Sequence, residues 1–202
     1  MRRISLAHTG IAEAAQIAAE ILGQGGVVLY PTDTLYGLAV DAGNPEAMRK
    51  LYAIKARNPH KPVSVLVPDL AAAEELVELT DEARALARKF FPGALTIVAR
   101  GKGSGESVGI RIPDNPFCLA LARTFGKPYT ATSANLAGAP DVTTVDAILA
   151  QLGEHAEGID LVVDDGARAS SVPSTVISFV HGKPELVREG AIPARELGLN
   201  LD

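Results

Sequence analysis

The sequence predicts an α/β fold in which a single domain is built on a mixed β-sheet with flanking helices. Three observations support this prediction. Helical and strand patterns alternate through the first two thirds of the 202 residues, and strand patterns dominate the end. Hydrophobic residues make up 47% of the chain and charged residues only 21%, which is typical of a globular protein. We find neither an internal repeat nor a linker-like change in composition, so one domain over residues 1–202 is expected.

The first elements are predicted by periodicity and by capping residues. Apolar and small residues recur at helical spacing over residues 11–22, and the β-branched run 27–30 predicts a buried strand that ends at Pro31. Asn44 is expected to cap the next helix, with Pro45 at its first position. Patterns further along the chain predict a strand over 62–67, a helix that opens at 69 or 70, and a helix over 81–91 that Thr80 caps.

The second half of the chain predicts two β-hairpins. Strands over 94–100 and 108–112 flank a glycine-rich stretch, 101–107, which is typical of a hairpin with a long tip. The last two strands, over 174–180 and 184–189, are joined at 181–183 and form the second hairpin. Between the hairpins we expect a helix over 116–126, a strand over 128–132, a helix over 145–152 that Thr143 or Thr144 caps, and a strand over 159–165.

Composition excludes several classes of protein. Nineteen Lys and Arg against 24 Asp and Glu give a net charge of −5, which disfavours a protein whose whole surface grips nucleic acid but allows a local basic patch. Cys118 is the single cysteine, so no intrachain disulfide forms, and we interpret it as a core residue. We find neither an apolar run long enough to span a membrane nor a signal-peptide core, so a cytoplasmic protein without a membrane partner is expected.

Polar residues follow several predicted strands or helix ends, where side chains can converge on a crevice of an open α/β sheet. Thr32, Asp33 and Thr34 follow the first buried strand. These residue types commonly cap turns, so the pattern fits a capped turn and a ligand site equally well.

A cationic cluster follows the helix that Asn44 opens. Lys55, Arg57, His60 and Lys61 lie within seven residues, which is chemically suited to an anion site because Arg offers a planar fork and Lys a point charge. The alternative is favourable charge at a helix C-terminus, worth roughly 0.3 to 1 kcal/mol, which explains one lysine but not the cluster.

Arg111 alternates with Ile110 and Ile112, so it points to the face of the strand opposite to these two residues. A buried arginine without a partner costs several kcal/mol, so this side chain must reach water or an anion. We favour an anion.

The remaining polar residues follow later strands. Ser133 and Asn135 come after the strand 128–132, a pattern that also fits an ordinary turn. Ser174 and Arg188 approach each other only if the register of the last hairpin allows it. The stretch 101–107 has neither the Walker A nor the Rossmann spacing, and we find no metal-ligand spacing. The residues therefore indicate an anionic, phosphate-bearing ligand but no particular reaction.

Six segments together resemble the YrdC family. In family order they are YPTDTLYGL, KARNPHKP, FFPGALTIV, VGIRIPDNP, TSANLAG, and PSTVI followed by VREG. The match extends from about residue 11 to 192. This resemblance implies a twisted open α/β sheet with a positively charged concave surface, and the chain resembles the short form of the family.

The resemblance also implies an activity, that of an L-threonylcarbamoyladenylate synthase. Such an enzyme condenses ATP, L-threonine and bicarbonate and releases pyrophosphate. Its product supplies the threonylcarbamoyl group for N6-threonylcarbamoyladenosine (t6A) at position 37 of tRNAs. Mg²⁺ is expected to arrive with ATP, no tightly bound cofactor and no protein metal site are expected, and a downstream threonylcarbamoyl transferase complex is the expected partner.

The family's functional residues transfer to this chain by motif. Lys55 and Arg57 resemble the catalytic pair that grips the ATP phosphates. The other implied ATP-binding residues are Ser107, Ser133, Asn135, Ser174 and Arg188. The implied threonine-binding residues are Thr32, Arg111, Ala131 and Thr132. One position departs from the pattern, because Leu66 stands where many long-form members have a histidine that contacts threonine.

Three alternatives stay open at this point. Members of this family have been described as gripping double-stranded RNA, so a module that binds double-stranded RNA or tRNA is one alternative and a tRNA contact by the synthase is compatible with it. The second is a paralogue without synthase activity, against which the Ser133 and Asn135 motif counts. The third is the carbamoyl-transfer domain of hydrogenase maturation proteins, against which the missing acylphosphatase and zinc-finger segments count.

Overall fold

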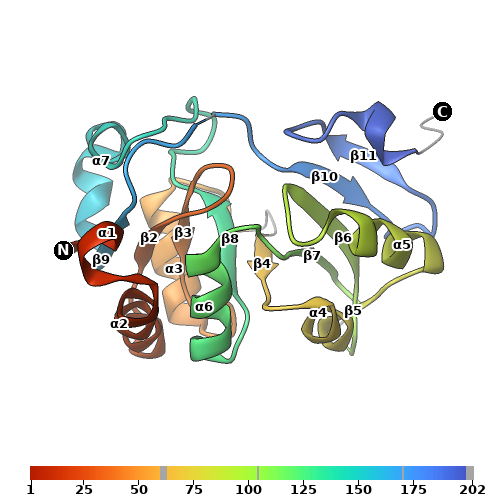
Figure 1. The fold of residues 1–202 in the computed structure, drawn as a ribbon, viewed down its shortest axis with the longest axis horizontal. Helices are drawn as coiled ribbons and strands as arrows, with labels where there is room; N and C mark the ends of the chain where they lie inside the picture. The colour runs from red at the N-terminus through yellow and green to blue at the C-terminus, as the bar shows by residue number, and fades with distance from the viewer. Residues whose placement is uncertain (60–62, 104, 170, 199–202) are drawn as a thin grey trace.

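A computed structural model describes residues 1–59, 63–103, 105–169 and 171–198 of the chain (Figure 1). Over these residues the strands form one mixed sheet in the order β1-β9-β2-β3-β8-β4-β7-β6-β10-β11, with β5 paired to β6. The strands are β1 (Arg2–Ser5), β2 (Val28–Pro31), β3 (Tyr36–Ala39), β4 (Ser64–Leu66), β5 (Val77–Glu78), β6 (Leu95–Gly101), β7 (Ser107–Arg111), β8 (Tyr129–Ser133), β9 (Leu161–Asp164), β10 (Thr175–Ser178) and β11 (Glu185–Arg188).

Helices flank this sheet, which confirms the predicted α/β class. They are α1 (Leu6–Thr9), α2 (Ile11–Gly23), α3 (Pro45–Ile54), α4 (Leu70–Leu76), α5 (Asp81–Phe90), α6 (Pro116–Phe125) and α7 (Val145–Leu152), with 3₁₀ helices η1 (Gly153–Gly158) and η2 (Ala194–Leu197). The parallel strand pairs are β1–β9, β2–β9, β4–β7 and β6–β10, and the antiparallel pairs are β2–β3, β3–β8, β4–β8, β5–β6, β6–β7 and β10–β11.

The helix starts that the sequence predicts are confirmed by capping bonds. The side chains of Asn44, Asp69, Thr80 and Thr144 each accept a backbone N–H from the first turn of the helix that follows. Such a cap stabilises a helix by about 1 kcal/mol. Both predicted hairpins, β6–β7 and β10–β11, are antiparallel pairs as expected.

The predicted end of the first buried strand at Pro31 is confirmed, because Pro31 is the last residue of β2. Pro31 lies in β2 opposite Tyr36, the first residue of β3, a strand that sequence analysis did not predict. This strand contains no β-branched residue and includes Gly37, so the usual signals of a strand are missing. A glycine is needed because a Cβ at this position would lie 2.9 Å from the ring of Tyr30. Residues 32–35, of which the first three are polar, therefore form the turn of a β-hairpin. The elements β1, α1 and β5 were also not predicted from the sequence.

The two halves of the sheet are covered differently (Figure 1). In the half around β2, Val28 and Tyr30 belong to the core that includes α2 and α6, while Leu29 belongs to the core that includes α3 and α7. In the half around β6, Leu95 and Ile97 pack in the core with α4 and α5. The alternate residues of β6 face the other way and line a cavity, so one face of this half is left for a ligand.

Candidate active site

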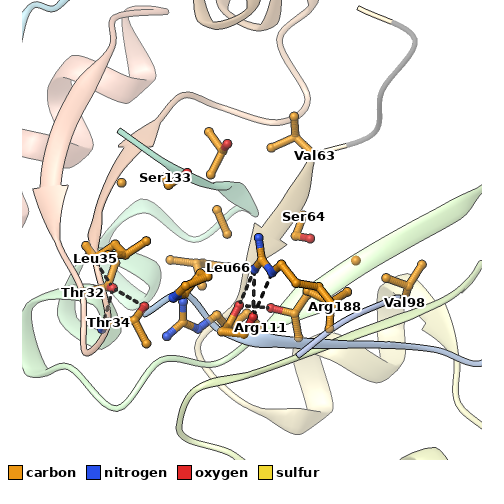
Figure 2. A pocket seen from close by; sticks show the side chains of 18 of the residues that line it. Thr32, Thr34, Leu35, Val63, Ser64, Leu66, Val98, Arg111, Ser133 and Arg188 are labelled. Carbon is orange, nitrogen blue, oxygen red and sulfur yellow. Dashed lines mark hydrogen bonds between the residues drawn. The ribbon is translucent and has the colours of Figure 1, made fainter. Parts of the chain in front are cut away.

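A cavity of about 420 Å³ lies on this uncovered face, where the two halves of the sheet meet. Its wall comes from the β2–β3 turn, from β3, β4, β6, β7 and β8, and from β10 and β11. Figure 2 shows the side chains of the β2–β3 turn on one side of the cavity and that of Arg188 on another. Segments far apart in the sequence therefore build one site, as the polar sets after predicted strands indicated.

The charge of the cavity differs from that of the whole chain. Among the described residues that line it, the charged ones are Arg57, Arg111 and Arg188, and none is acidic. The chain itself carries a net charge of −5. Cations gathered in a concave site on an acidic protein favour an anionic ligand there, because low-dielectric walls concentrate their field.

The β2–β3 turn contributes Thr32 and Thr34 to the cavity wall, and both residues are buried. The Thr32 hydroxyl donates to the Leu35 carbonyl at 2.7 Å and accepts the Thr34 N–H at 3.0 Å. The turn is thus capped by its own threonine, as one interpretation of the sequence had it. Because the same residue also lines the cavity, the two interpretations of this turn are compatible.

Arg111 finds its anion within the chain. Its Nη2 lies 2.6 Å from Asp33 Oδ1, and the side chains of these two residues are only 9% and 13% exposed. Its Nε donates to the Gly93 carbonyl at 3.3 Å. Arg111 nevertheless lines the cavity, so the pair fixes the direction of a guanidinium that a ligand can still reach. This role of Asp33 was not predicted from the sequence.

Lys55 is buried beside the cavity rather than in its wall. Its ammonium donates to the Ser133 carbonyl, to the Asn135 carbonyl at 2.9 Å and to Asn135 Oδ1 at 3.2 Å. An ammonium has three N–H groups, and all three have acceptors here. Burial lowers the pKa of Lys55 to about 8, and the nearby charge of Arg57 acts in the same direction. This lysine therefore holds the end of β8 in place.

Ser133 and Asn135 contact each other, but only Ser133 lies in the cavity wall. Ser133 lines the cavity, and its hydroxyl donates to Asn135 Oδ1 at 2.7 Å. The Asn135 amide donates to the Ala139 carbonyl at 2.7 Å, and Asn135 is not among the residues of the cavity wall. The two residues are brought together as predicted, but only the serine faces the cavity. Ala131 and Thr132 also line it.

Arg57 reaches the cavity wall because the chain bends after α3. Ala56 has a φ of +47°, a left-handed conformation that is uncommon outside glycine. The Arg57 N–H then donates to the Tyr52 carbonyl at 3.0 Å. His60 and Lys61, which sequence analysis placed in the same cationic cluster, lie outside the described residues.

The last hairpin brings Ser174 and Arg188 together, which was left open by the sequence. Arg188 Nη2 donates to the Ser174 carbonyl at 2.8 Å, and the Ser174 hydroxyl lies 2.9 Å from Thr96 Oγ1. Partial burial lowers the pKa of Arg188, Asp141 opposes this shift, and the charge of Arg111 adds to it. Ser107, the first residue of β7 in the other hairpin, also lines the cavity.

Several cavity residues were not predicted from the sequence. They are small or apolar residues on the uncovered face, among them Ser64, Thr96, Val98 and Gly109. The polar Thr96 between Leu95 and Ile97 was a usable signal, because alternation places it on the opposite face. Leu66, which departs from the family pattern, also lines the cavity.

Gly109 leaves space for the side chain of Ser64 in the cavity wall, which leads to a prediction. A Cβ at Gly109 would lie 2.2 Å from Ser64 Oγ and 2.9 Å from Ser64 Cβ. We expect Gly109→Ala to lower the free energy of unfolding by about 1 to 3 kcal/mol through overpacking, as measured by urea denaturation. Adding Ser64→Gly should restore most of this loss, and a double variant no more stable than Gly109→Ala would contradict the explanation.

Cys118 is a core residue, as predicted. It is fully buried, its Sγ donates to the Pro31 carbonyl at 3.2 Å, and burial raises the pKa of its thiol. Among the described residues we find no group of three or more His, Cys, Asp or Glu that could hold a metal ion. In the same part of the chain, no helix is long and apolar enough to cross a membrane.

A comparison with protein families decides the relationship of this chain. The Sua5/YciO/YrdC family model, described as "Telomere recombination", matches residues 20–190. The chain belongs to this family. The resemblance seen in the six sequence segments is therefore confirmed.

Relatives and solved structures of the Sua5/YciO/YrdC family agree with this placement. The chain is 39% identical to a putative threonylcarbamoyl-AMP synthase of Methanocaldococcus jannaschii, over 88% of this chain and 86% of that protein. It is 36% identical to the threonylcarbamoyl-AMP synthase of Bacillus subtilis, over 89% of this chain but only 54% of that protein. The chain thus spans about half the length of the Bacillus relative.

A solved structure supports the observed fold directly. The structure of Sua5 from Pyrococcus abyssi complexed with L-threonine superimposes with a TM-score of 0.83 at 29% identity. The superposition covers 91% of this chain and 56% of that one. The fold described above is therefore similar to that of the superimposed part of the Pyrococcus protein.

Proposed function

We propose that this protein is an L-threonylcarbamoyladenylate synthase, a nucleotidyltransferase that condenses ATP, L-threonine and bicarbonate to threonylcarbamoyl-AMP and releases pyrophosphate. The observation that carries the proposal is the cavity wall with Arg57, Arg111 and Arg188 and no acidic residue among those described. The names of the Bacillus and Methanocaldococcus relatives support it, as does the threonine complex of the Pyrococcus protein.

The reaction places several negative charges in one small space. The amine of threonine attacks bicarbonate and gives a carbamate and water. A carbamate oxygen then attacks the α-phosphate of ATP while pyrophosphate leaves. Both the threonine carboxylate and the triphosphate need cationic partners, which the arginines offer without any side chain acting as a covalent nucleophile. Mg²⁺ enters as part of the substrate MgATP. Holding the reactants in line supplies a further share of the rate gain.

We assign the two ends of the cavity to the two substrates. Thr32, Ala131, Thr132 and Arg111 form the threonine end, where the guanidinium fixed by Asp33 faces the amino-acid carboxylate. The triphosphate takes the end with Arg57, Ser107, Ser133, Ser174 and Arg188. Lys55 and Asn135 complete this end by holding the chain at Ser133.

The product of such a synthase is an activated threonylcarbamoyl group. We propose that a downstream threonylcarbamoyl transferase complex places it on adenosine 37 of tRNAs in the cytoplasm, which makes this protein part of t6A synthesis. Because the chain has a net charge of −5, we assign any tRNA contact of this protein to a local patch rather than to its whole surface.

The test is pyrophosphate release by the purified protein. With ATP, Mg²⁺, bicarbonate and a panel of amino acids, we expect release to be strongest with L-threonine. Release that does not depend on threonine would overturn the synthase assignment. If the protein instead formed a tight, salt-sensitive complex with tRNA and showed no turnover, the RNA-binding alternative would replace it.

Arg57 provides a prediction about the triphosphate end. Because its side chain lines the cavity, Arg57→Ala is expected to lower kcat/KM about 100- to 1000-fold through lost charge stabilisation. The melting temperature should stay close to that of the wild type. Arg49→Ala is the matched control, since this arginine is 72% exposed on the preceding helix and should leave both quantities unchanged. Loss of many degrees in the Arg57 variant would make that residue structural.

A further inference from the structure

We infer that Arg168 is a positioning residue for the threonine end of the cavity, which it holds in shape through the β2–β3 turn. The inference rests on the proposed function. Arg168 is not among the residues that line the cavity, and it lies in the segment 165–169 that follows β9. Its side chain is only 13% exposed, so it is built into the fold rather than placed on the surface.

The guanidinium of Arg168 has three partners. Nη1 donates to the Thr32 carbonyl at 3.2 Å. Nη2 donates to the Asp165 carbonyl at 2.5 Å and to Asp165 Oδ2 at 2.7 Å. Its Cζ lies 5.2 Å from the centre of the Tyr36 ring, a cation–π distance. A planar guanidinium that is oriented by its own segment thus reaches two residues of the cavity wall.

The same segment also grips the hydroxyl of Tyr36. This hydroxyl donates to the Gly166 carbonyl at 2.7 Å and accepts the Asp165 N–H at 2.9 Å. Tyr36 is the first residue of β3 and Thr32 follows the last residue of β2, so the segment holds both ends of the turn. Both residues line the cavity, and any shift of the turn moves them together.

Two arginines therefore clamp one turn, and they differ in what else they do. Arg111 holds the Asp33 side chain and faces the cavity, whereas Arg168 holds the Thr32 main chain from outside it. Removing Arg168 should loosen the turn without taking a cation out of the cavity. The effect should fall on threonine, because Arg57 and Arg188 at the triphosphate end are not among the contacts of Arg168.

The test compares Arg168→Met with Arg168→Lys in pyrophosphate release. We expect the methionine variant to raise the KM for threonine about tenfold at saturating ATP and bicarbonate, with the KM for ATP changed less than twofold. Lysine keeps the charge but loses the planar fork, so its KM for threonine should fall between those of the wild type and the methionine variant. Calorimetric titration of threonine into each variant should rank the affinities in the same order.

Two further variants separate positioning from general stability. Asp165→Asn should raise the KM for threonine less than Arg168→Met does, and the double variant should resemble Arg168→Met because the two residues act as one unit. Arg84→Met is the matched control, since Arg84 pairs with Glu74 and Asp81 and does not line the cavity. It should leave both KM values unchanged.

Two results would overturn the inference. One is an unchanged KM for threonine in Arg168→Met. The other is an equal rise in both KM values together with a large fall in melting temperature in Arg168→Met and Arg168→Lys alike. A wild-type protein without threonine-dependent turnover would overturn the proposed function instead, so the two failures are distinguishable.

Discussion

Arg111→Met is expected to reduce turnover about a thousandfold or more and to lower the free energy of unfolding by about 2 to 3 kcal/mol. Turnover falls because the variant removes a cavity guanidinium that the proposed function places against the threonine carboxylate. Stability falls because the Asp33 side chain, only 13% exposed, loses the partner 2.6 Å away. Steady-state pyrophosphate release and urea denaturation measure the two effects.

A second substitution separates these two effects of Arg111. Adding Asp33→Asn removes the unpaired carboxylate, so the double variant should regain most of the lost stability. It should not regain turnover, because no guanidinium is restored to the cavity. Recovery of turnover in the double variant would contradict a direct role of Arg111 in holding a substrate.

Lys55→Met is expected to lower turnover at least about a hundredfold, although Lys55 does not line the cavity. The variant removes the N–H donors that Lys55 supplies to the Ser133 carbonyl and to both oxygens of Asn135, of which only Oδ1 keeps the Ser133 hydroxyl as a donor. The end of β8 can then shift beside the end of the cavity that we assign to the triphosphate. Lys50→Met is the matched control, since Lys50 lies in α3, the helix that Lys55 follows, and donates to the Gly25 carbonyl. Full turnover in the Lys55 variant would show that the anchor is dispensable.

The pKa of Lys55 links the same anchor to pH. Burial lowers this pKa from 10.5 to about 8, so between these values the unfolded chain binds a proton that the folded protein has released. The free energy of unfolding should therefore rise with pH over this range through this group, by at most about 1.4 kcal/mol per pH unit. Turnover should fall over the same range, because a neutral amine has two N–H groups for three acceptors.

The measurement is urea denaturation of the wild type and of Lys55→Met from pH 7 to 10. The wild type should gain stability relative to the variant as pH rises above about 8. Parallel curves for the two proteins would mean that Lys55 does not titrate in this range.

Local chemistry made much of the fold predictable from the sequence. Asn44, Asp69 and Thr80 predict the starts of their helices because a side-chain cap acts within three residues. Tertiary packing did not override these local signals. The strand β3 escaped prediction because its glycine is required by the ring of Tyr30 on the neighbouring strand. That contact exists only after the hairpin has formed.

The candidate site was likewise only partly predictable from the sequence. Residue type alone indicated that Arg111 needs an anion, since a buried cation is costly without one, and that the cluster with Lys55 and Arg57 suits an anion site. Which anion Arg111 meets in the folded chain, namely Asp33, depends on how the β2–β3 turn is placed against β7. No role for Arg168 was predicted from the sequence, because its contacts with the Thr32 carbonyl and the Tyr36 ring form only in the folded chain.

The sequence by itself therefore determined the α/β class and the helix starts, and it indicated an anionic ligand, because periodicity, capping and the cost of a buried charge are properties of residue types. Only the tertiary structure decided which side chains face the cavity and which hold it in shape. Lys55 and Ser133 belong to one sequence-predicted site, yet the lysine uses its three N–H groups on the chain and the serine faces the cavity. The role of each side chain depends on its hydrogen-bond partners in other strands, and these partners come within reach only when distant segments meet in the fold.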